Sequence, residues 1–232
     1  MDGIKQNTRN EILRKKILDI EKIQIGKCPI DSPWVKPVRI CYTQDGHEKV
    51  WDVVKSHDSV GIVVFNTTRK KLILVRQFRP AAYYACLPDK VEKINLKQYP
   101  PSLGLTLELC AGIVDKDKPL VEIARDELRE ECGYEAPASA FTKIVTYRGV
   151  GSGATKQTLF YVEVTDEMHI YPGGGAESEG ELIELVEMNV EEAKEYITSG
   201  ESGCTQLTQA RPHFKFVNKN FKALVHCSSE LN

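Results

Sequence analysis

The sequence has no cysteine framework, no long apolar run and no excess of charge of either sign. Its seven cysteines form no CxxC pair, and their odd number argues against a disulfide scaffold or a zinc ribbon. No apolar run approaches the roughly 18 residues of a membrane span, and the polar N-terminus lacks an apolar signal core. Lys and Arg total 31 against 33 Asp and Glu, so the basic excess of a nucleic-acid-binding protein is missing. We therefore expect a soluble cytoplasmic protein that binds neither nucleic acid nor membrane.

The 232 residues suffice for one large domain, and a hydrophobic content of 41% allows a buried core. Strand-like runs dominate the middle of the sequence, and helical segments interrupt them without regular βαβ alternation. This order predicts a mixed α+β fold instead of a doubly wound parallel sheet. Predicted strands cover residues 38–43, 49–55, 60–65, 71–78, 105–110, 141–147, 157–164 and 181–187; predicted helices cover 119–132 and 190–198, with a short one from Thr8 or Asn10 to Asp19 and a last one opening at Pro212.

The chain divides into three predicted parts. Residues 1–27 form a polar N-terminal tail, and residues 28–58 form a β subdomain in which Asp45-Gly46 marks a hairpin turn. Residues 59–232 form the main domain, with a proline-rich surface insertion at 86–104 and a glycine-rich loop at 171–180.

The predicted helix over 119–132 carries carboxylates on the side that should be buried. At about 100° per residue, Glu127 and Glu131 share a face with apolar residues, and Glu130 lies at its flank. None of the three has a Lys or Arg three or four residues away. Partly desolvated, locally unpaired carboxylates are costly, so either a distant cation pairs with them or a metal does. Hard oxygen ligands of this kind suit Mg²⁺ or Mn²⁺; the alternative is ordinary solvated surface charge.

The opposite side of this helix has the composition of a solvent face. Glu122 and Arg125 are spaced to pair along it, and so are Asp126 and Arg129. We therefore expect these four side chains to be exposed.

The segment 112–134 resembles the Nudix box, G-x5-E-x7-R-E-U-x-E-E-x-G-U, where U is a bulky apolar residue. The residues that match with the spacing intact are Gly112, Glu127, Leu128, Glu130, Glu131, Gly133 and Tyr134. Two positions depart: Lys118 replaces the early Glu, and Asp126 replaces the Arg before the first helix Glu. In the family that Arg braces the helix by an ion pair, so its replacement affects the bracing more than the metal site.

Flanking motifs resemble one branch of the family, the nucleoside diphosphate-sugar pyrophosphatases. The motifs are HDSV at 57–60, QFRP at 77–80, ELCAG at 108–112 and EGELIE at 179–184, and the resemblance covers about residues 28–225. It implies a Nudix fold, a mixed β-sheet sandwiched between helices, with an N-terminal antiparallel β-sheet.

The implied activity is Mg²⁺-dependent hydrolysis of a nucleoside diphosphate sugar, foremost UDP-glucose to UMP and glucose 1-phosphate. Hydrolysis of ADP-ribose to AMP and ribose 5-phosphate is an alternative, because both reactions use the same metal site. A second alternative is a non-catalytic Nudix-fold domain that binds a nucleotide, although such a domain would be expected to lose one of the box glutamates. Cap removal on a nucleic acid is disfavoured because no basic stripe is apparent.

The resemblance also assigns the metal ligands. Glu127 and Glu131, one turn apart, are the expected direct ligands of Mg²⁺, for which Mn²⁺ can substitute. Glu130 would complete the cluster directly or through water and so take part in catalysis. The backbone carbonyl before the box glycine, which is that of Ala111, is the fourth expected ligand.

In the ADP-ribose branch of the family, the general base is a Glu in a mobile loop after the box. The loop at 173–180 offers Glu179, then Glu181, and also Glu177; the alternative is that these residues only add solubility.

Substrate contacts are expected from an arginine and two tryptophans. Arg79 of the QFRP motif would contact the diphosphate. Trp51 and Trp34 could stack on the nucleobase, the alternative being core packing. In the branch the N-terminal strands pack on a partner subunit, so we expect a homodimer with shared active sites.

Overall fold

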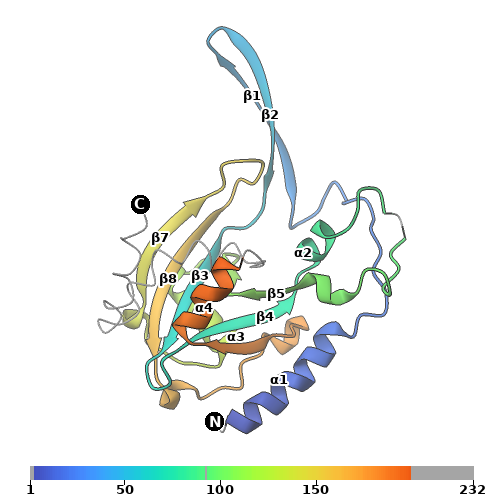
Figure 1. The fold of residues 1–232 in the computed structure, drawn as a ribbon. Coiled ribbons are helices and arrows are strands. Elements are labelled where there is room, and N and C mark those ends of the chain that lie inside the picture. The colour runs from blue at the N-terminus through green and yellow to red at the C-terminus, as the bar shows by residue number, and fades with distance from the viewer. Residues whose placement is uncertain (1–2, 92, 200–232) are drawn as a thin grey trace, which may run out of the picture.

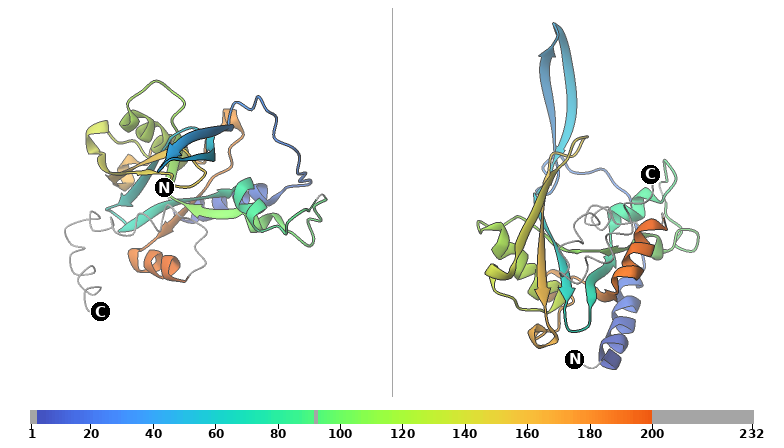
Figure 2. Two further views of the ribbon diagram at one scale, coloured as in Figure 1. Left: turned by 90° about the horizontal axis from the view of Figure 1, so that it is seen from above. Right: turned by 60° about the vertical axis from the view of Figure 1, so that its left-hand side comes forward.

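The computed structural model of the chain describes residues 3–91 and 93–199 (Figures 1 and 2). The helix predicted to open at Pro212 lies outside these ranges. Within them, no helix combines the length and the apolar character that crossing a membrane requires.

The described residues form a mixed α+β structure, as predicted. Its helices are α1 (Gly3–Leu18), α2 (Pro80–Ala85), α3 (Leu120–Cys132) and α4 (Val190–Thr198), with 3₁₀ turns η1 (Pro101–Gly104), η2 (Ala138–Ala140), η3 (Asp166–Met168) and η4 (Glu177–Glu179). Its strands are β1 (Lys36–Gln44), β2 (His47–Lys55), β3 (Ser59–Asn66), β4 (Lys71–Phe78), β5 (Leu105–Glu108), β6 (Cys110–Ile113), β7 (Thr142–Arg148), β8 (Lys156–Val164) and β9 (Glu184–Met188).

The main sheet is mixed and splays open between β3 and β4. These strands pair only over Val64–Asn66 with Lys71–Ile73, and β3 also pairs in parallel with β8. The prediction of one strand over 105–110 is wrong: the chain turns at Leu109, so that β5 pairs with β4 and β6 pairs with β3. The strand predicted at 181–187 starts later, at Glu184, because the residues before it belong to a loop. The splay places the backbone of β6 beside the N-terminal half of β3.

Helices cover both faces of this sheet (Figure 2). On one face α3 packs its apolar side into a core; on the other α4 packs into a second core. The helix residues buried in these cores are Ile123, Ala124, Leu128 and Cys132 from α3, and Val190, Ala193 and Ile197 from α4. Burial follows the 3.6-residue period, which is why both helices could be predicted from the sequence.

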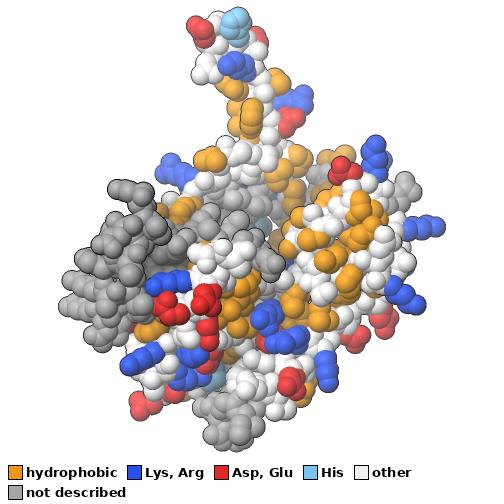
Figure 3. Space-filling model, viewed as in Figure 1, with side chains coloured by type: hydrophobic (Ala, Val, Ile, Leu, Met, Phe, Trp, Pro, Cys, Tyr) orange, Lys and Arg blue, Asp and Glu red, His pale blue; other side chains and the backbone are white. Residues whose placement is uncertain are grey.

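The strands β1 and β2 form a ribbon that projects from the body (Figure 1). Its turn has positive φ at Asp45 (52°) and Gly46 (74°), as a tight two-residue hairpin requires. Its base is held to the body where the backbone N–H of Val54 donates to Ser152 (2.6 Å) and the carbonyl of Val54 accepts from Ala154 (2.9 Å). Apolar side chains stay exposed along the ribbon (Figure 3), and they include Val38, Ile40, Val50 and Trp51.

The N-terminal helix is longer than predicted and is docked on the sheet. It begins at Gly3, so the prediction that Thr8 or Asn10 starts it is wrong. The Asn10 side chain donates to the carbonyl of Leu185 (2.6 Å), and Arg14 pairs with Glu184, which is 1% exposed. These long-range partners, which no local pattern reveals, fix α1 along β9.

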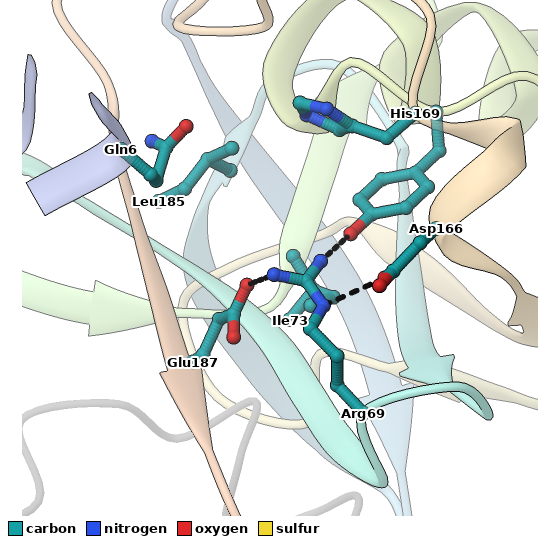
Figure 4. Close-up of a pocket in the computed structure, with 8 residues that line it drawn as sticks. Gln6, Arg69, Ile73, Asp166, His169, Leu185 and Glu187 are labelled. Carbon is teal, nitrogen blue, oxygen red and sulfur yellow. Dashed lines mark hydrogen bonds and ion pairs between the residues drawn. The ribbon is translucent and has the colours of Figure 1, made fainter. Parts of the chain in front are cut away.

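A polar network anchors the far end of α3 (Figure 4). Arg69 pairs with Asp166 (2.7 Å) and Glu187, and its guanidinium also donates to the Tyr134 hydroxyl. The Asn66 amide donates to Asp166 (2.7 Å) and to the same hydroxyl (3.2 Å). Tyr134 comes two residues after the end of α3, so this network ties the C-terminal end of the helix to β3 and β9.

Candidate active site

Pro119 and Gly133, at the two ends of the helix predicted from the sequence, define the ends of α3. Pro119, where the sequence predicts the helix to start, is the N-cap residue, and the helix itself begins at Leu120. Gly133 closes the helix in the left-handed conformation (φ 76°), and a Cβ there would lie 2.4 Å from the carbonyl oxygen of Tyr171. The glycine is therefore required by both its dihedral angle and its neighbours.

Two glutamates of α3 are held in a poorly solvated position. Glu131 is 3% exposed, and its Oε2 accepts a hydrogen bond from the backbone N–H of Ala111 (2.9 Å). Burial, followed by repulsion from Glu127, outweighs that bond and raises the pKa of Glu131 to about 8. Burial, with repulsion from Glu130 and Glu181, raises the pKa of Glu127 to about 7. Both carboxyl groups are therefore harder to ionise than a solvated glutamate.

The box glycine explains how the β6 backbone approaches these side chains. A Cβ at Gly112 would lie 2.0 Å from Oε1 of Glu127, which no side chain can tolerate. Glycine at this position therefore lets Ala111 and Gly112 run directly beside the two carboxylates.

Glu130 lies at the flank of the same helix and is half-buried. It has one local cation, because Arg129 Nη2 lies 3.6 Å from its Oε1. No ion pair of this kind involves Glu127 or Glu131 within the described parts of the chain.

The side chains of Glu127, Glu130 and Glu131 line a cleft of about 240 Å³. The residues that line it include Ser59, Gln77, Arg79, Ala111, Gly112, Lys116, Glu127, Glu130, Glu131, Gln157, Glu179 and Glu181. The loop after Tyr171 brings Glu179 and Glu181 into the lining of this cleft, and Oε2 of Glu181 accepts a hydrogen bond from the N–H of Ala176 (2.9 Å). Glu177 starts the turn η4 in this loop.

The donor set of the cleft fits a hard cation. No group of three or more His, Cys, Asp or Glu side chains converges on one point within residues 3–91 and 93–199. However, Glu127 and Glu131 are poorly solvated carboxylates that form no ion pair with a side chain of the described residues, and oxygen donors of this kind are what Mg²⁺ and Mn²⁺ bind.

Comparison with known proteins finds relatives over most of the chain. It is 42% identical over 190 residues to the protein named uridine diphosphate glucose pyrophosphatase NUDT14 from Mus musculus, covering 76% of this chain and 85% of the relative. The protein of that name from Bos taurus is 40% identical, with the same coverage. GDP-mannose pyrophosphatase from Cronobacter sakazakii is 32% identical over 149 residues, covering 64% of this chain and 69% of the relative.

The chain belongs to the Nudix hydrolases. Its relatives place it among the nucleoside diphosphate-sugar pyrophosphatases of that family, enzymes that act on diphosphate bonds. A solved structure described as an ADP compounds hydrolase has the same fold, with a TM-score of 0.53 at 14% identity, covering 85% of this chain and 93% of the other. A scan against protein-family models finds no match.

In this Nudix hydrolase the side chain of Arg79 lines the cleft, and the carboxylate of Glu108 fixes its orientation. Nε and Nη2 of Arg79 both donate to the buried Glu108, at a closest distance of 2.7 Å, and Thr106 also donates to Glu108. Burial would lower the pKa of Arg79, but the bond to Glu108 outweighs it and raises that pKa above its ordinary value. Glu108 belongs to the ELCAG motif, but the sequence does not reveal this contact, because the contact depends on β5 lying beside β4.

The two tryptophans do not line the cleft of their own chain. Trp51 lies on the projecting hairpin and is 54% exposed, and Trp34 precedes the hairpin and is 61% exposed. The Trp34 ring lies 5.9 Å from that of His57, in a separate pocket near Lys36 and Lys55.

The two departures from the Nudix box are partners of each other. Lys118 Nζ donates to Asp126 Oδ2 (2.8 Å), so the box has a cation where the pattern has Glu and an anion where it has Arg. The expectation that Asp126 lies on a solvent face is wrong, because it is 8% exposed. Its predicted ion pair with Arg129 does form, at 3.9 Å, and the predicted pair Glu122–Arg125 forms at 2.7 Å. The Lys118 hydrogen bond holds the pKa of Asp126 below its ordinary value.

Reversing the charge of either Lys118 or Asp126 should destabilise the protein, and reversing both charges together should restore most of the lost stability. Asp126→Arg or Lys118→Glu alone should lower the free energy of unfolding by about 2 kcal/mol, a value reduced because Lys118 is half-exposed. The double variant should recover most of the loss, although Arg125 and Arg129 will oppose a new arginine. Urea denaturation of the four proteins gives the coupling energy.

The pair Glu122–Arg125, in which both side chains are partly exposed, provides the matched control. Its reversal should change the free energy of unfolding by less than about 0.5 kcal/mol. Additive losses in the Lys118 and Asp126 variants would contradict the assignment of a charge-reversed brace.

Proposed function

We propose that this enzyme hydrolyses UDP-glucose to UMP and glucose 1-phosphate. The observation that carries the proposal is the cleft in which the poorly solvated Glu127 and Glu131 face Arg79, a site suited to a charged diphosphate. The choice of nucleotide and sugar is supported by the name of the relatives that are 40–42% identical.

The proposed cofactor is Mg²⁺, for which Mn²⁺ can substitute. Carboxylates of Glu127 and Glu131, with Glu130 and the carbonyl of Ala111, would hold it. When bound, the cation would neutralise charge on the diphosphate and lower the pKa of a bound water. The buried setting of Glu131 and its bond to Ala111 keep two of these donors in fixed relation.

Arg79 would hold the diphosphate. Since Nε and Nη2 are engaged with Glu108, Nη1 is left to donate to a phosphate oxygen from a fixed direction. Such fixed, charge-assisted bonds orient the bond that is to be broken.

The proposed general base is Glu179, with Glu181 as the second candidate. Both line the same cleft as the α3 carboxylates, and both are exposed enough to accept a proton from an attacking water.

The enzyme is proposed to act in the cytoplasm as a homodimer. An isolated two-stranded ribbon is marginally stable at best in water, so the exposed apolar side chains of β1 and β2 favour cover by a second copy. The partner's hairpin would then bring Trp51 or Trp34 to the nucleobase. Free cysteines, among the described residues Cys28, Cys41, Cys86, Cys110 and Cys132, are compatible with a reducing compartment.

Product analysis by phosphorus NMR tests the proposed reaction. Incubation with UDP-glucose and Mg²⁺ should give UMP and glucose 1-phosphate, and EDTA should stop it. Glu131→Gln should abolish turnover, whereas Glu122→Gln, on the other side of α3, should retain it. A faster metal-dependent reaction with ADP-ribose or GDP-mannose would reject UDP-glucose as the substrate, and inertness toward all three would reject the proposed function.

The general base can be identified by paired substitutions in the loop. Glu179→Gln should lower kcat by about 100-fold or more while leaving Mn²⁺ affinity unchanged, because the carboxylate acts on a proton and not on the cation. Glu195→Gln, an exposed change on α4, serves as the control. If Glu181→Gln is the slower variant, Glu181 is the base.

Sedimentation velocity tests the proposed dimer. The wild-type protein should sediment as a dimer at micromolar concentration, and Val50→Lys with Trp51→Lys should shift it toward monomer because charge replaces apolar contact area. A wild-type protein that is only monomeric would refute this arrangement.

A further inference from the structure

The loop that carries Glu179 and Glu181 begins with an unusual run of glycines. Gly173, Gly174 and Gly175 have φ values of 60°, 102° and 93°, a region that side chains rarely adopt. Consecutive glycines leave a chain with many accessible conformations, so an ordered start to this loop requires contacts that select one of them.

One set of contacts comes from the end of α3. The N–H of Gly174 donates to the carbonyl of Glu131 (2.8 Å), and the N–H of Gly175 donates to that of Glu130 (3.1 Å). The last carbonyls of a helix lack partners within the helix, so the loop satisfies them. The loop is thereby held against the backbone of two residues whose side chains face the cleft.

A second set comes from the N-terminal helix. Arg9 of α1 donates through Nη1 to the carbonyl of Pro172 and through Nη2 to that of Gly173 (2.8 Å). Within residues 3–91 and 93–199, no carboxylate forms an ion pair with Arg9. Its planar guanidinium donates hydrogen bonds to two successive carbonyls at the point where the glycine run begins.

Arg9 itself is held in place because α1 is anchored along β9 by Asn10, its immediate neighbour, and by Arg14 further along the helix. Asn10 donates to the carbonyl of Leu185, and Arg14 pairs with the buried Glu184. The guanidinium therefore reaches the loop from a docked helix and not from a free tail.

We propose that Arg9 is a positioning residue for the reaction. It fixes the start of the loop at Pro172 and Gly173, and so keeps Glu179 and Glu181 over Glu127 and Glu131. This inference rests on the proposed function, in which the loop supplies the general base. It also gives a part in turnover to the N-terminal helix, which the sequence predicts only as a short helix within a polar tail.

The test compares Arg9→Ala, Arg9→Lys and Arg14→Ala, the last removing the same residue type from the same helix. With UDP-glucose, Arg9→Ala should lower kcat about 10-fold, while KM and Mn²⁺ affinity stay within about twofold of wild type, because the binding groups remain in place. Arg9→Lys should recover part of kcat, since an ammonium can serve one carbonyl but not both in a fixed plane. Arg14→Ala should lower the melting temperature and leave kcat of the folded protein unchanged, because the bond from Asn10 to Leu185 still docks the helix beside Arg9.

Amide hydrogen exchange gives a readout that does not need a substrate. Exchange of residues 173–181 should be faster in Arg9→Ala than in wild type, and should be unchanged in Arg14→Ala below its melting temperature. If the wild-type protein hydrolyses none of the nucleotide sugars, the proposed function fails and the exchange data alone decide whether Arg9 orders the loop.

Two results would overturn the proposal. One is an Arg9→Ala protein with wild-type kcat and wild-type exchange over residues 173–181. The other is an equal loss of kcat in Arg14→Ala, which would assign the effect to docking of the whole helix.

Discussion

The structure depends on one constraint, the burial of two carboxylates where a helix packs on a splayed sheet. Glu127 and Glu131 lie beside the backbone of β6, and no Lys or Arg among the described residues forms an ion pair with either of them. Their raised pKa values reflect the free-energy cost of burying two carboxylates close together. Gly112 is required because β6 passes so close, and the splay between β3 and β4 is what admits β6 there.

The rest of the molecule holds this strained arrangement from both ends of α3. At the start of the helix, Lys118 and Asp126 form an ion pair with the polarity of the family pattern reversed. At its end, Tyr134 is held by Arg69 and Asn66, and the glycine loop caps the last carbonyls. An exchange of charges at two positions preserves the attraction between them, so a sequence can depart from the pattern twice and keep its geometry.

Local patterns predicted what depends on local chemistry. The period of α3 and α4, the Asp45-Gly46 hairpin and the box itself were all readable, because capping, turn geometry and helix faces are set by neighbours in sequence. The missed contacts join distant segments: Arg79 with Glu108 and Arg14 with Glu184. Such pairs exist only once β4, β5, β9 and α1 lie side by side. The paired departures from the box were a signal of contact, since their charges are opposite.

Calorimetric titration with Mn²⁺ in buffers of different ionisation enthalpy tests the central claim, that Glu127 and Glu131 together form a cation site. Because both pKa values are raised, to about 7 and about 8, binding at pH 7 should release about one proton or more, and affinity should rise with pH until about pH 8. Glu131→Gln should lose most of the affinity and part of the proton release. Binding without proton release at pH 7, or equal affinity in Glu131→Gln, would contradict the account.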